Sequence, residues 1–239
     1  MSAIAAQAFK RVLVPVAVLL GFMIGLGLLV TKIWGHAWPF TAENGINGGI
    51  AGDRTGFGNA VTWFFSAVGS TPVIIAVTAL AAIALRLTLH RWREPLYLCS
   101  AVSAQAIVFF FTTKAIDRAR PTVSHMDQSP PTSSFPSGHT SAAVALYVGL
   151  AFVLALLVRR TWLKVLCWAL ILIPLAVAMS RLYRGMHHPS DLVASFLNGF
   201  ACILIMARGV LDRSVSWSRA RRPGGTRRER SRELDASTT

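Results

Sequence analysis

Long runs of residues without any charge dominate this chain and limit its fold more than any other feature. The first run, Val12 to Val30, holds 19 uncharged residues; as a helix it would be about 28 Å long, close to the ~30 Å hydrocarbon core of a bilayer. Only 14% of the 239 residues are charged and 54% are apolar, whereas soluble domains contain about 25% charged residues. The sequence therefore predicts an integral membrane protein and excludes a soluble enzyme, a disulfide scaffold and a disordered chain.

Six segments are expected to cross the membrane as helices. The uncharged run from Phe57 to Leu85 is too long for one span and should break near Gly69 to Pro72, because glycine and proline interrupt helices. Its first part is expected to lie at the membrane interface. The predicted spans are Val12–Val30, Pro72–Leu85, Pro95–Thr113, Thr140–Val158, Val165–Met179 and Leu192–Ala207. The last two are short, so Lys164 or Arg208 would have to extend to the membrane surface. The predicted fold class is an all-α polytopic membrane protein with six transmembrane helices, in one domain over residues 1–211.

The distribution of basic residues predicts the orientation. If the N-terminus is cytoplasmic, 17 of the 24 Lys and Arg residues fall in cytoplasmic segments, and such segments are enriched in these residues. Both termini are therefore expected in the cytoplasm of a multi-pass cell-membrane protein. Residues 212–239 form a basic tail that we expect to be disordered and to rest against anionic lipid headgroups. Nucleic-acid binding is not favoured, because the tail has no aromatic residue besides Trp217.

Three polar clusters fall at the extracytoplasmic ends of spans three to six. They read KAIDRARP from Lys114 to Pro121, FPSGHT from Phe135 to Thr140, and SRLYRGMHHPSD from Ser180 to Asp191. The predicted topology brings all three to one face of the membrane although they are far apart in sequence. This convergence indicates a candidate active site.

Several of these residues are suited to binding a phosphoryl group. Lys114, Arg120 and Arg181 would form a positive pocket, and arginine can bind phosphate through two N–H groups. Ser137 and Gly138 stand where span four is expected to begin, and the free N–H groups and dipole of a helix N-terminus favour an anion. Gly138 has no side chain, so an oxyanion can approach the backbone closely.

The third cluster adds a candidate nucleophile. Asp191 should lie in the first turn of span six and reach back to one ring nitrogen of His187, which leaves the other nitrogen free to attack. His139 can act as the general acid that protonates the departing oxygen. Arginines and backbone dipoles can stabilise the transferring group without a metal, and the three cysteines have no metal-binding spacing. No metal or other cofactor is expected.

These motifs resemble those of the type-2 phosphatidic acid phosphatase superfamily, in particular its membrane lipid phosphatase branch. The second motif of the family stands at Pro136-Ser137-Gly138-His139, and the third at Ser180, Arg181, His187 and Asp191. The first motif, Lys-x6-Arg-Pro, is displaced, because Lys114 is one residue closer to Arg120 and Thr113 occupies the expected lysine position.

The resemblance implies metal-independent hydrolysis through a phosphohistidine. His187 would attack phosphorus with support from Asp191, and His139 would protonate the leaving group. Phosphate oxygens would be held by Arg120, Ser137, Gly138 and Arg181, with Lys114 as a weaker candidate because of its displacement.

The expected partner is a lipid phosphate that enters the site from the bilayer. A polyprenyl diphosphate is favoured, because an outward-facing site suits recycling of a carrier lipid; phosphatidate or phosphatidylglycerol phosphate is the alternative. A phosphotransferase with a lipid or sugar acceptor and an inactive binder are further alternatives. A transporter is disfavoured, since the six span cores contain no charged residue. Three outer cations, Lys32, Arg54 and Arg118, are interpreted as interfacial anchors.

Overall fold

The structure is a computed structural model that describes residue 7 and residues 9–128 and 131–212. These residues form helices and no strands. Six helical segments among them are long and apolar enough to cross a membrane: Phe9–His36, Thr71–Leu89, Arg93–Ala115, Gly138–Leu157, Thr161–Tyr183 and Pro189–Leu211. The predicted all-α, six-span fold is confirmed. The tail beyond Asp212 lies outside the described residues, so its expected disorder and its contact with anionic lipid stay predictions.

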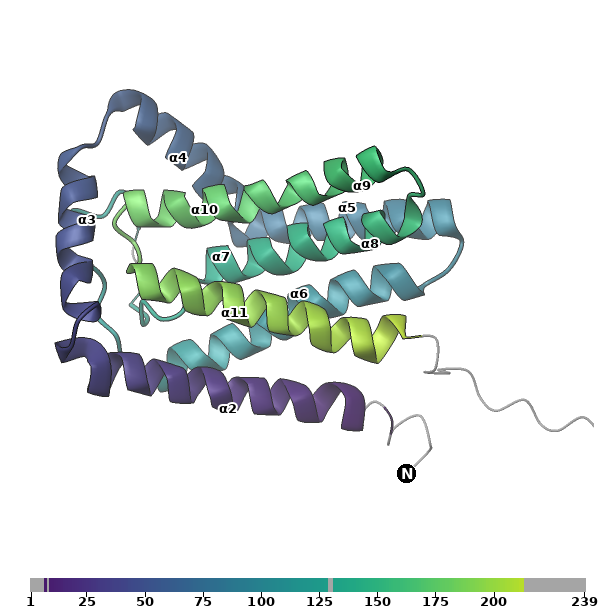
Figure 1. Ribbon diagram of the computed structural model, residues 1–239, viewed down its shortest axis with the longest axis horizontal. Coiled ribbons are helices and arrows are strands. Elements are labelled where there is room, and N and C mark those ends of the chain that lie inside the picture. The colour runs from purple at the N-terminus through teal and green to yellow at the C-terminus, as the bar shows by residue number, and fades with distance from the viewer. Residues whose placement is uncertain (1–6, 8, 129–130, 213–239) are drawn as a thin grey trace, which may run out of the picture.

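The six spans and two connecting helices follow one another along the chain. Span one contains α2 (Val14–Leu28), and spans two and three are α5 (Thr71–Leu89) and α6 (Arg93–Ala115). Span four joins α7 (Gly138–Ala143) to α8 (Gly149–Leu157), span five joins α9 (Thr161–Trp168) to α10 (Leu172–Tyr183), and span six begins with α11 (Pro189–Met206). Between spans one and two lie α3 (Glu43–Gly52) and α4 (Gly56–Val68), at the end of the bundle opposite the N-terminus (Figure 1).

The long uncharged run breaks where glycine and proline predicted it would. Helix α4 ends before Gly69, and α5 begins at Thr71 with Pro72 in its first turn. The predicted ends of the last two spans were wrong, because both helices continue through polar residues to a length of 23 residues each. Their polar ends, which include the buried Arg181 and Asp191, face the protein interior. Neither Lys164 nor Arg208 therefore has to compensate for a short span.

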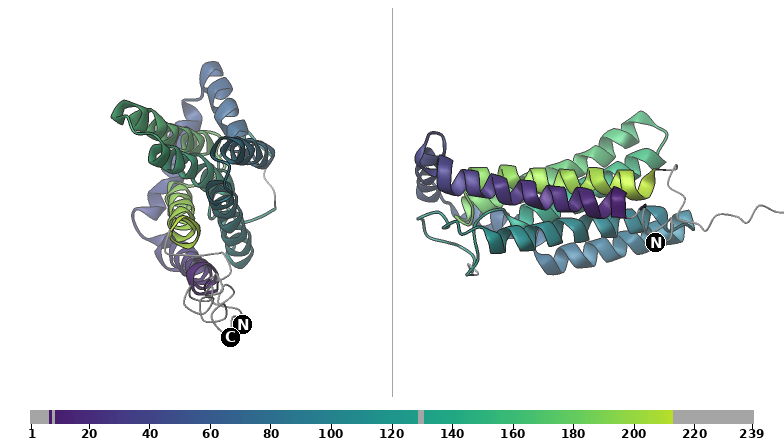
Figure 2. Two further views of the ribbon diagram at one scale, coloured as in Figure 1. Left: turned by 90° about the vertical axis from the view of Figure 1, so that its right-hand side faces the viewer. Right: turned by 90° about the horizontal axis from the view of Figure 1, so that it is seen from below.

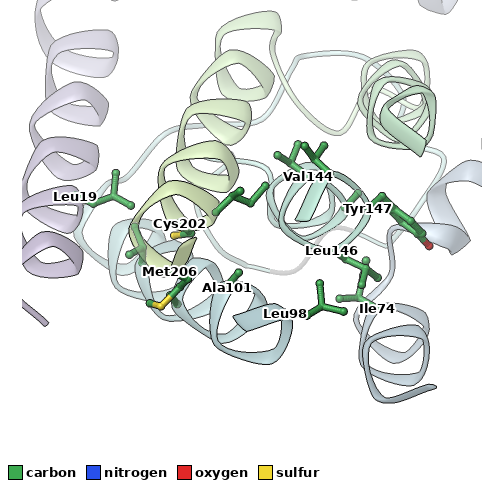
Figure 3. Packing of buried hydrophobic residues seen from close by; sticks show 14 of the residues in the cluster. Leu19, Ile74, Leu98, Ala101, Val144, Leu146, Tyr147, Cys202 and Met206 are labelled. Carbon is green, nitrogen blue, oxygen red and sulfur yellow. The ribbon is translucent and has the colours of Figure 1, made fainter. Parts of the chain in front are cut away.

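Span four forms the centre of the bundle and is the most buried of the six. Figure 3 shows Val144 and Leu146 of this span packed among side chains of neighbouring helices. Helix α11 approaches it closely at Gly199, where an added Cβ would lie 2.6 Å from the Cβ of Val144. Small residues permit such close contact between membrane helices. This packing fixes the position of the first turn of α7, which carries Gly138 and His139.

The two ends of the described chain lie together at one end of the bundle. Arg11 and Asp212 form an ion pair of 3.1 Å there, and Figure 2 shows the start of α2 on the same side as the end of span six. At the opposite end, α6 and α10 finish and α7 and α11 begin, so the three polar clusters meet there.

Candidate active site

A pocket of about 710 Å³ lies where the three polar clusters meet. Its polar part contains five of the eight predicted site residues, namely Gly138, His139, Arg120, Arg181 and His187. They come from the start of α7, the loop after α6, the end of α10 and the turn before α11. The structure thus brings together the predicted nucleophile, the predicted general acid and three of the predicted phosphate ligands.

His187 is held in a tight turn between α10 and α11. Gly185 has a φ of +70°, a backbone conformation that glycine adopts readily, and Pro189 begins α11. The Nδ1 atom of His187 lies 2.7 Å from the carbonyl oxygen of Ser134. A carbonyl oxygen can only accept a hydrogen bond, so Nδ1 carries the proton and Nε2 keeps its lone pair.

The surroundings of His187 keep its ring neutral. Burial lowers the pKa of His187 well below its ordinary value of 6.5, and the positive charges of Arg181 and Arg120 lower it further. At neutral pH the imidazole is therefore uncharged, which is the form that can act as a nucleophile.

Asp191 does not contact His187 in the way predicted. Its Oδ2 atom lies 3.8 Å from Nδ1 of His187, which is too far for a hydrogen bond. As the third residue of α11, Asp191 instead turns back to cap the helix and accepts the backbone N–H of His188 at 2.8 Å. It also accepts the hydroxyl of Ser134 at 2.7 Å. Asp191 therefore acts on His187 through Ser134, whose carbonyl oxygen holds the ring.

Arg118 is part of this buried network, and its interpretation as an interfacial anchor was wrong. Its Nη1 contacts Asp191 and donates to Ser190 Oγ at 2.8 Å, while Nη2 donates to Glu43 Oε2 at 2.6 Å. Only 10% of the Arg118 side chain and none of the Asp191 side chain is exposed. Glu43, on α3, is 75 residues away in sequence, so no local pattern could have predicted this pair.

Asp127 places a carboxylate inside the pocket and is another residue that the sequence analysis missed. Arg184 donates to it from Nε at 2.9 Å and from Nη2 at 2.6 Å. Arg181 donates from Nη1 to both Asp127 and Ser66. Burial by itself raises the pKa of Asp127, but the hydrogen bonds and charges of Arg184 and Arg181 outweigh it and lower the pKa to about 2. The carboxylate is thus ionised at neutral pH and fixes both guanidinium groups.

Two arginine nitrogens in the pocket are buried and have no hydrogen-bond partner among the described residues: Nε of Arg120 and Nε of Arg181. The Nη1 atom of Arg120 donates to the carbonyl oxygen of Met186 at 2.8 Å, which holds this side chain in place. Beside them, a Cβ on Gly138 would lie 2.8 Å from the Phe109 ring. Buried N–H donors without partners are costly, and an oxyanion in this pocket would satisfy them.

Ser137 lies outside the pocket. Its side chain is fully buried, its hydroxyl accepts from the Thr140 hydroxyl at 3.2 Å, and its backbone N–H donates to Ser195 Oγ at 2.7 Å. The Ser137 N–H is therefore used within the protein, and the hydroxyl oxygen caps the helix that starts at Gly138.

Lys114 also lies outside the pocket. It is exposed, its Nζ lies 6.0 Å from the centre of the Phe110 ring, and it lines a neighbouring hollow of about 430 Å³. The displacement of one residue turns a helical side chain by about 100°. Thr113, at the position where the family motif has lysine, is buried and donates to the carbonyl oxygen of Ser133.

The remaining part of the pocket is apolar and opens sideways. Trp63 of α4, Ile75 of α5 and Phe110 of α6 line it, and each of these side chains is more than half exposed on the outside of the bundle. Exposed apolar residues on a membrane-spanning bundle are expected to face lipid. Within the described part of the chain, no group of three or more His, Cys, Asp or Glu residues could hold a metal ion.

A six-span bundle with an imidazole and unpartnered arginine nitrogens in one pocket is the arrangement expected of a membrane phosphatase. The family profile of the PAP2 superfamily matches residues 94–214, which is half of the chain, and the chain belongs to this superfamily. It is a metal-independent phosphatase of that family.

Two solved structures share the fold. The transmembrane PAP2-type phosphatidylglycerolphosphate phosphatase of Bacillus subtilis is 20% identical, with a TM-score of 0.69 over 86% of this chain and 98% of the other. LpxE of Aquifex aeolicus is also 20% identical, with a TM-score of 0.53 over 70% of this chain and 96% of the other. The comparison with curated proteins found no match.

Proposed function

We propose that this phosphatase removes the terminal phosphate of a membrane lipid through a phosphohistidine on His187. The observation that carries the proposal is the pairing of His187 Nδ1 with the Ser134 carbonyl oxygen at 2.7 Å. This contact fixes the tautomer with a free lone pair on Nε2. The same pocket is lined by two arginines with unpartnered Nε atoms and by exposed apolar side chains that would face lipid in a membrane.

In the first step, Nε2 of His187 attacks phosphorus, and a P–N bond forms as the P–O bond to the lipid breaks. His139 donates a proton to the departing oxygen, so that the lipid leaves as an alcohol or, from a diphosphate, as a monophosphate. In the second step, water attacks phosphorus and gives a proton to His139, and the P–N bond breaks. Arg120 and Arg181 hold the phosphoryl oxygens throughout, since preorganised donors stabilise the charge of the transferring group.

Two substrate classes agree with this chemistry. A polyprenyl diphosphate and a glycerophospholipid with a terminal phosphate both present a phosphate at headgroup depth and keep their hydrocarbon in the bilayer. The structural relative from Bacillus subtilis is named as a phosphatidylglycerolphosphate phosphatase, which supports the glycerolipid class. Transfer of the phosphoryl group to a lipid or sugar hydroxyl in place of water would give a phosphorylated acceptor and less inorganic phosphate.

Trapping of the covalent intermediate tests the proposal. After a brief reaction with a lipid carrying a ³²P-labelled terminal phosphate, alkaline denaturation should leave the label on the wild-type chain, and acid should release it. His187→Asn should abolish both labelling and phosphate release, while His36→Asn, on an exposed histidine outside the pocket, should retain both. Labelling that survives in His187→Asn would refute His187 as the nucleophile.

We also propose that the termini are cytoplasmic and the site extracytoplasmic, as the basic residues favour. In a variant without native cysteines, Gly52→Cys at the end of α3 and Thr161→Cys at the start of α9 stand at opposite ends of the bundle. A membrane-impermeant thiol reagent applied to intact cells should label the first variant and not the second. The reverse pattern would overturn the orientation.

A further inference from the structure

The turn that carries His187 has no regular secondary structure, so its backbone polar groups need partners from outside the turn. The N–H of His188 finds one in the carboxylate of Asp191, at 2.8 Å. The carbonyl oxygen of His187 itself accepts from Nδ2 of Asn47 at 3.2 Å. Asn47 is therefore in direct contact with the backbone of the candidate nucleophile, and the proposed chemistry does not yet use it.

Asn47 belongs to α3, a helix that is not one of the six spans. Figure 1 shows α3 running across the end of the bundle, beside the end of α10 and the start of α11. Ile50 of α3 packs against a small buried cluster on these two helices, formed by Ala178, Leu182 and Leu192. This packing keeps α3 against the turn that joins α10 to α11, where His187 lies.

A second residue of α3 holds the same turn. Glu43 stands four residues before Asn47, and residues at this spacing lie on the same face of a helix. The Oε1 atom of Glu43 accepts the backbone N–H of Ser190 at 2.8 Å. Both side chains are buried, and both lie outside residues 94–214, which match the family profile. Helix α3 thus holds the chain at two points, at His187 and at the start of α11.

The amide of Asn47 is oriented by its contact with His187. Turning the amide over would place Oδ1 against the carbonyl oxygen of His187, and two acceptors cannot form a hydrogen bond. In the observed orientation Oδ1 is buried without a partner among the described residues, which costs about 1–3 kcal/mol. Sequences commonly accept such a local cost at functional sites. The donor of Asn47 is therefore its useful part.

We propose that Asn47 is a positioning residue that holds the His187 imidazole in line with phosphorus. The ring is fixed at Nδ1 by the carbonyl oxygen of Ser134 at 2.7 Å, and Asn47 fixes the backbone from which the side chain projects. Without this second contact the turn can rotate about Gly185, because glycine has few conformational restrictions. This inference rests on the proposed function, in which Nε2 of His187 attacks phosphorus.

Single-turnover kinetics of Asn47→Ala test the inference. The enzyme is used in saturating excess over a lipid with a ³²P-labelled terminal phosphate, so the rate constant of phosphate release reports on the folded molecules alone. Asn47→Ala should lower this rate constant at least about tenfold, because a displacement of about 1 Å can cost about a hundredfold. Asn47 lies outside the pocket, so KM should stay within about threefold.

Asn44→Ala is the matched control. Asn44 is the same residue type on the same helix, but it is exposed, and its Oδ1 accepts the N–H of Thr122 at 3.4 Å. Its replacement should leave the single-turnover rate constant within about twofold.

Equal rate constants in Asn47→Ala and Asn44→Ala would overturn the inference. So would a loss confined to Tm or to the yield of folded protein, which would indicate a structural role only, or a rise in KM without slower single turnover, which would indicate contact with the substrate. If Asn47→Ala does not fold, Asn47→Leu, which fills the space of the amide and removes its donors, should show the same slow turnover at unchanged KM. Labelling of the chain that survives in His187→Asn would instead refute the proposed function.

Discussion

Replacement of Arg118 tests the buried ionic network that supports the candidate nucleophile. Arg118 contacts two carboxylates, Asp191 and Glu43, whose side chains are 0% and 7% exposed. Arg118→Met preserves most of the apolar part of the side chain and leaves both carboxylates without their cation. Removal of one partner from a buried ion pair costs about 3–5 kcal/mol, because the remaining charge is uncompensated. For a chain of this size such a loss should lower Tm by about 10 °C.

The same change should slow the reaction. Asp191 accepts the hydroxyl of Ser134, and the Ser134 carbonyl oxygen holds Nδ1 of His187. If Asp191 shifts after the loss of Arg118, the imidazole loses its alignment with phosphorus. A displacement of about 1 Å can cost about a hundredfold in rate. We therefore expect kcat to fall about a hundredfold in Arg118→Met, with a much smaller change in KM.

Thermal unfolding in detergent and phosphate release are the two assays, and Arg11→Met is the matched control. Arg11 pairs with Asp212 at 3.1 Å at the other end of the bundle, where the two side chains are 40% and 43% exposed, and exposed pairs contribute little. Glu43→Gln combined with Arg118→Met should recover part of the lost stability, because it removes one of the two unpaired charges. If Arg118→Met were as stable and as active as the Arg11→Met control, the network would have no role in holding His187.

Three further predictions follow from the site. Ser137→Ala should lower the free energy of unfolding by about 1 kcal/mol through loss of the helix cap and leave KM within about threefold, whereas a direct phosphate ligand would raise KM much further. Lys114→Ala should retain kcat/KM within about threefold, and a hundredfold loss would place its ammonium group on the phosphate after all. Burial keeps the pKa of His187 in the folded state well below its unfolded value of 6.5. When the pH falls below 6.5, His187 of the unfolded chain therefore binds a proton, whereas His187 of the folded chain stays neutral. Wild-type stability should then decrease by up to about 1.4 kcal/mol per pH unit relative to His187→Asn, and parallel Tm profiles of the two proteins between pH 7.5 and 5 would contradict the depressed pKa.

The sequence predicted the spans and the meeting of the three clusters because both depend on local patterns. An uncharged run of sufficient length has to cross the membrane as a helix, and alternation of span directions then fixes which ends lie on the same side. For this reason His139, His187, Arg120 and Arg181 could be assigned to one site before the fold was known. The ends of the last two spans were wrong, because polar residues such as Ser180 and Arg181 remain helical when the protein interior covers them.

The partners of the charged groups could not be predicted, because they depend on contacts between distant segments. Arg118 and Glu43 are 75 residues apart, and Arg181 and Asp127 are 54 apart; neither pair is marked by spacing. The sequence also predicted that the carboxylate of Asp191 would contact His187, since the two residues are one helical turn apart. The carboxylate instead accepts hydrogen bonds from the N–H of His188 and the hydroxyl of Ser134. The position of Asp191 in the first turn of α11 explains these partners.

The positions of the charges bear on how the proposed site would bind a dianion and still release phosphate. Arginines in and around the pocket would hold the product tightly if no acidic residue compensated them. Asp127 fixes Arg181 and Arg184, and Asp191 and Glu43 neutralise Arg118. Arg120 and Arg181, which line the pocket, each have a buried Nε atom without a partner among the described residues. Phosphate therefore meets a small number of directed N–H donors in place of an excess of charge. Donors of this kind are most effective when they are aimed at oxygens whose charge increases in the transition state. In the proposed mechanism, Asp127 and the two carboxylates beside the pocket therefore favour turnover over retention of the product.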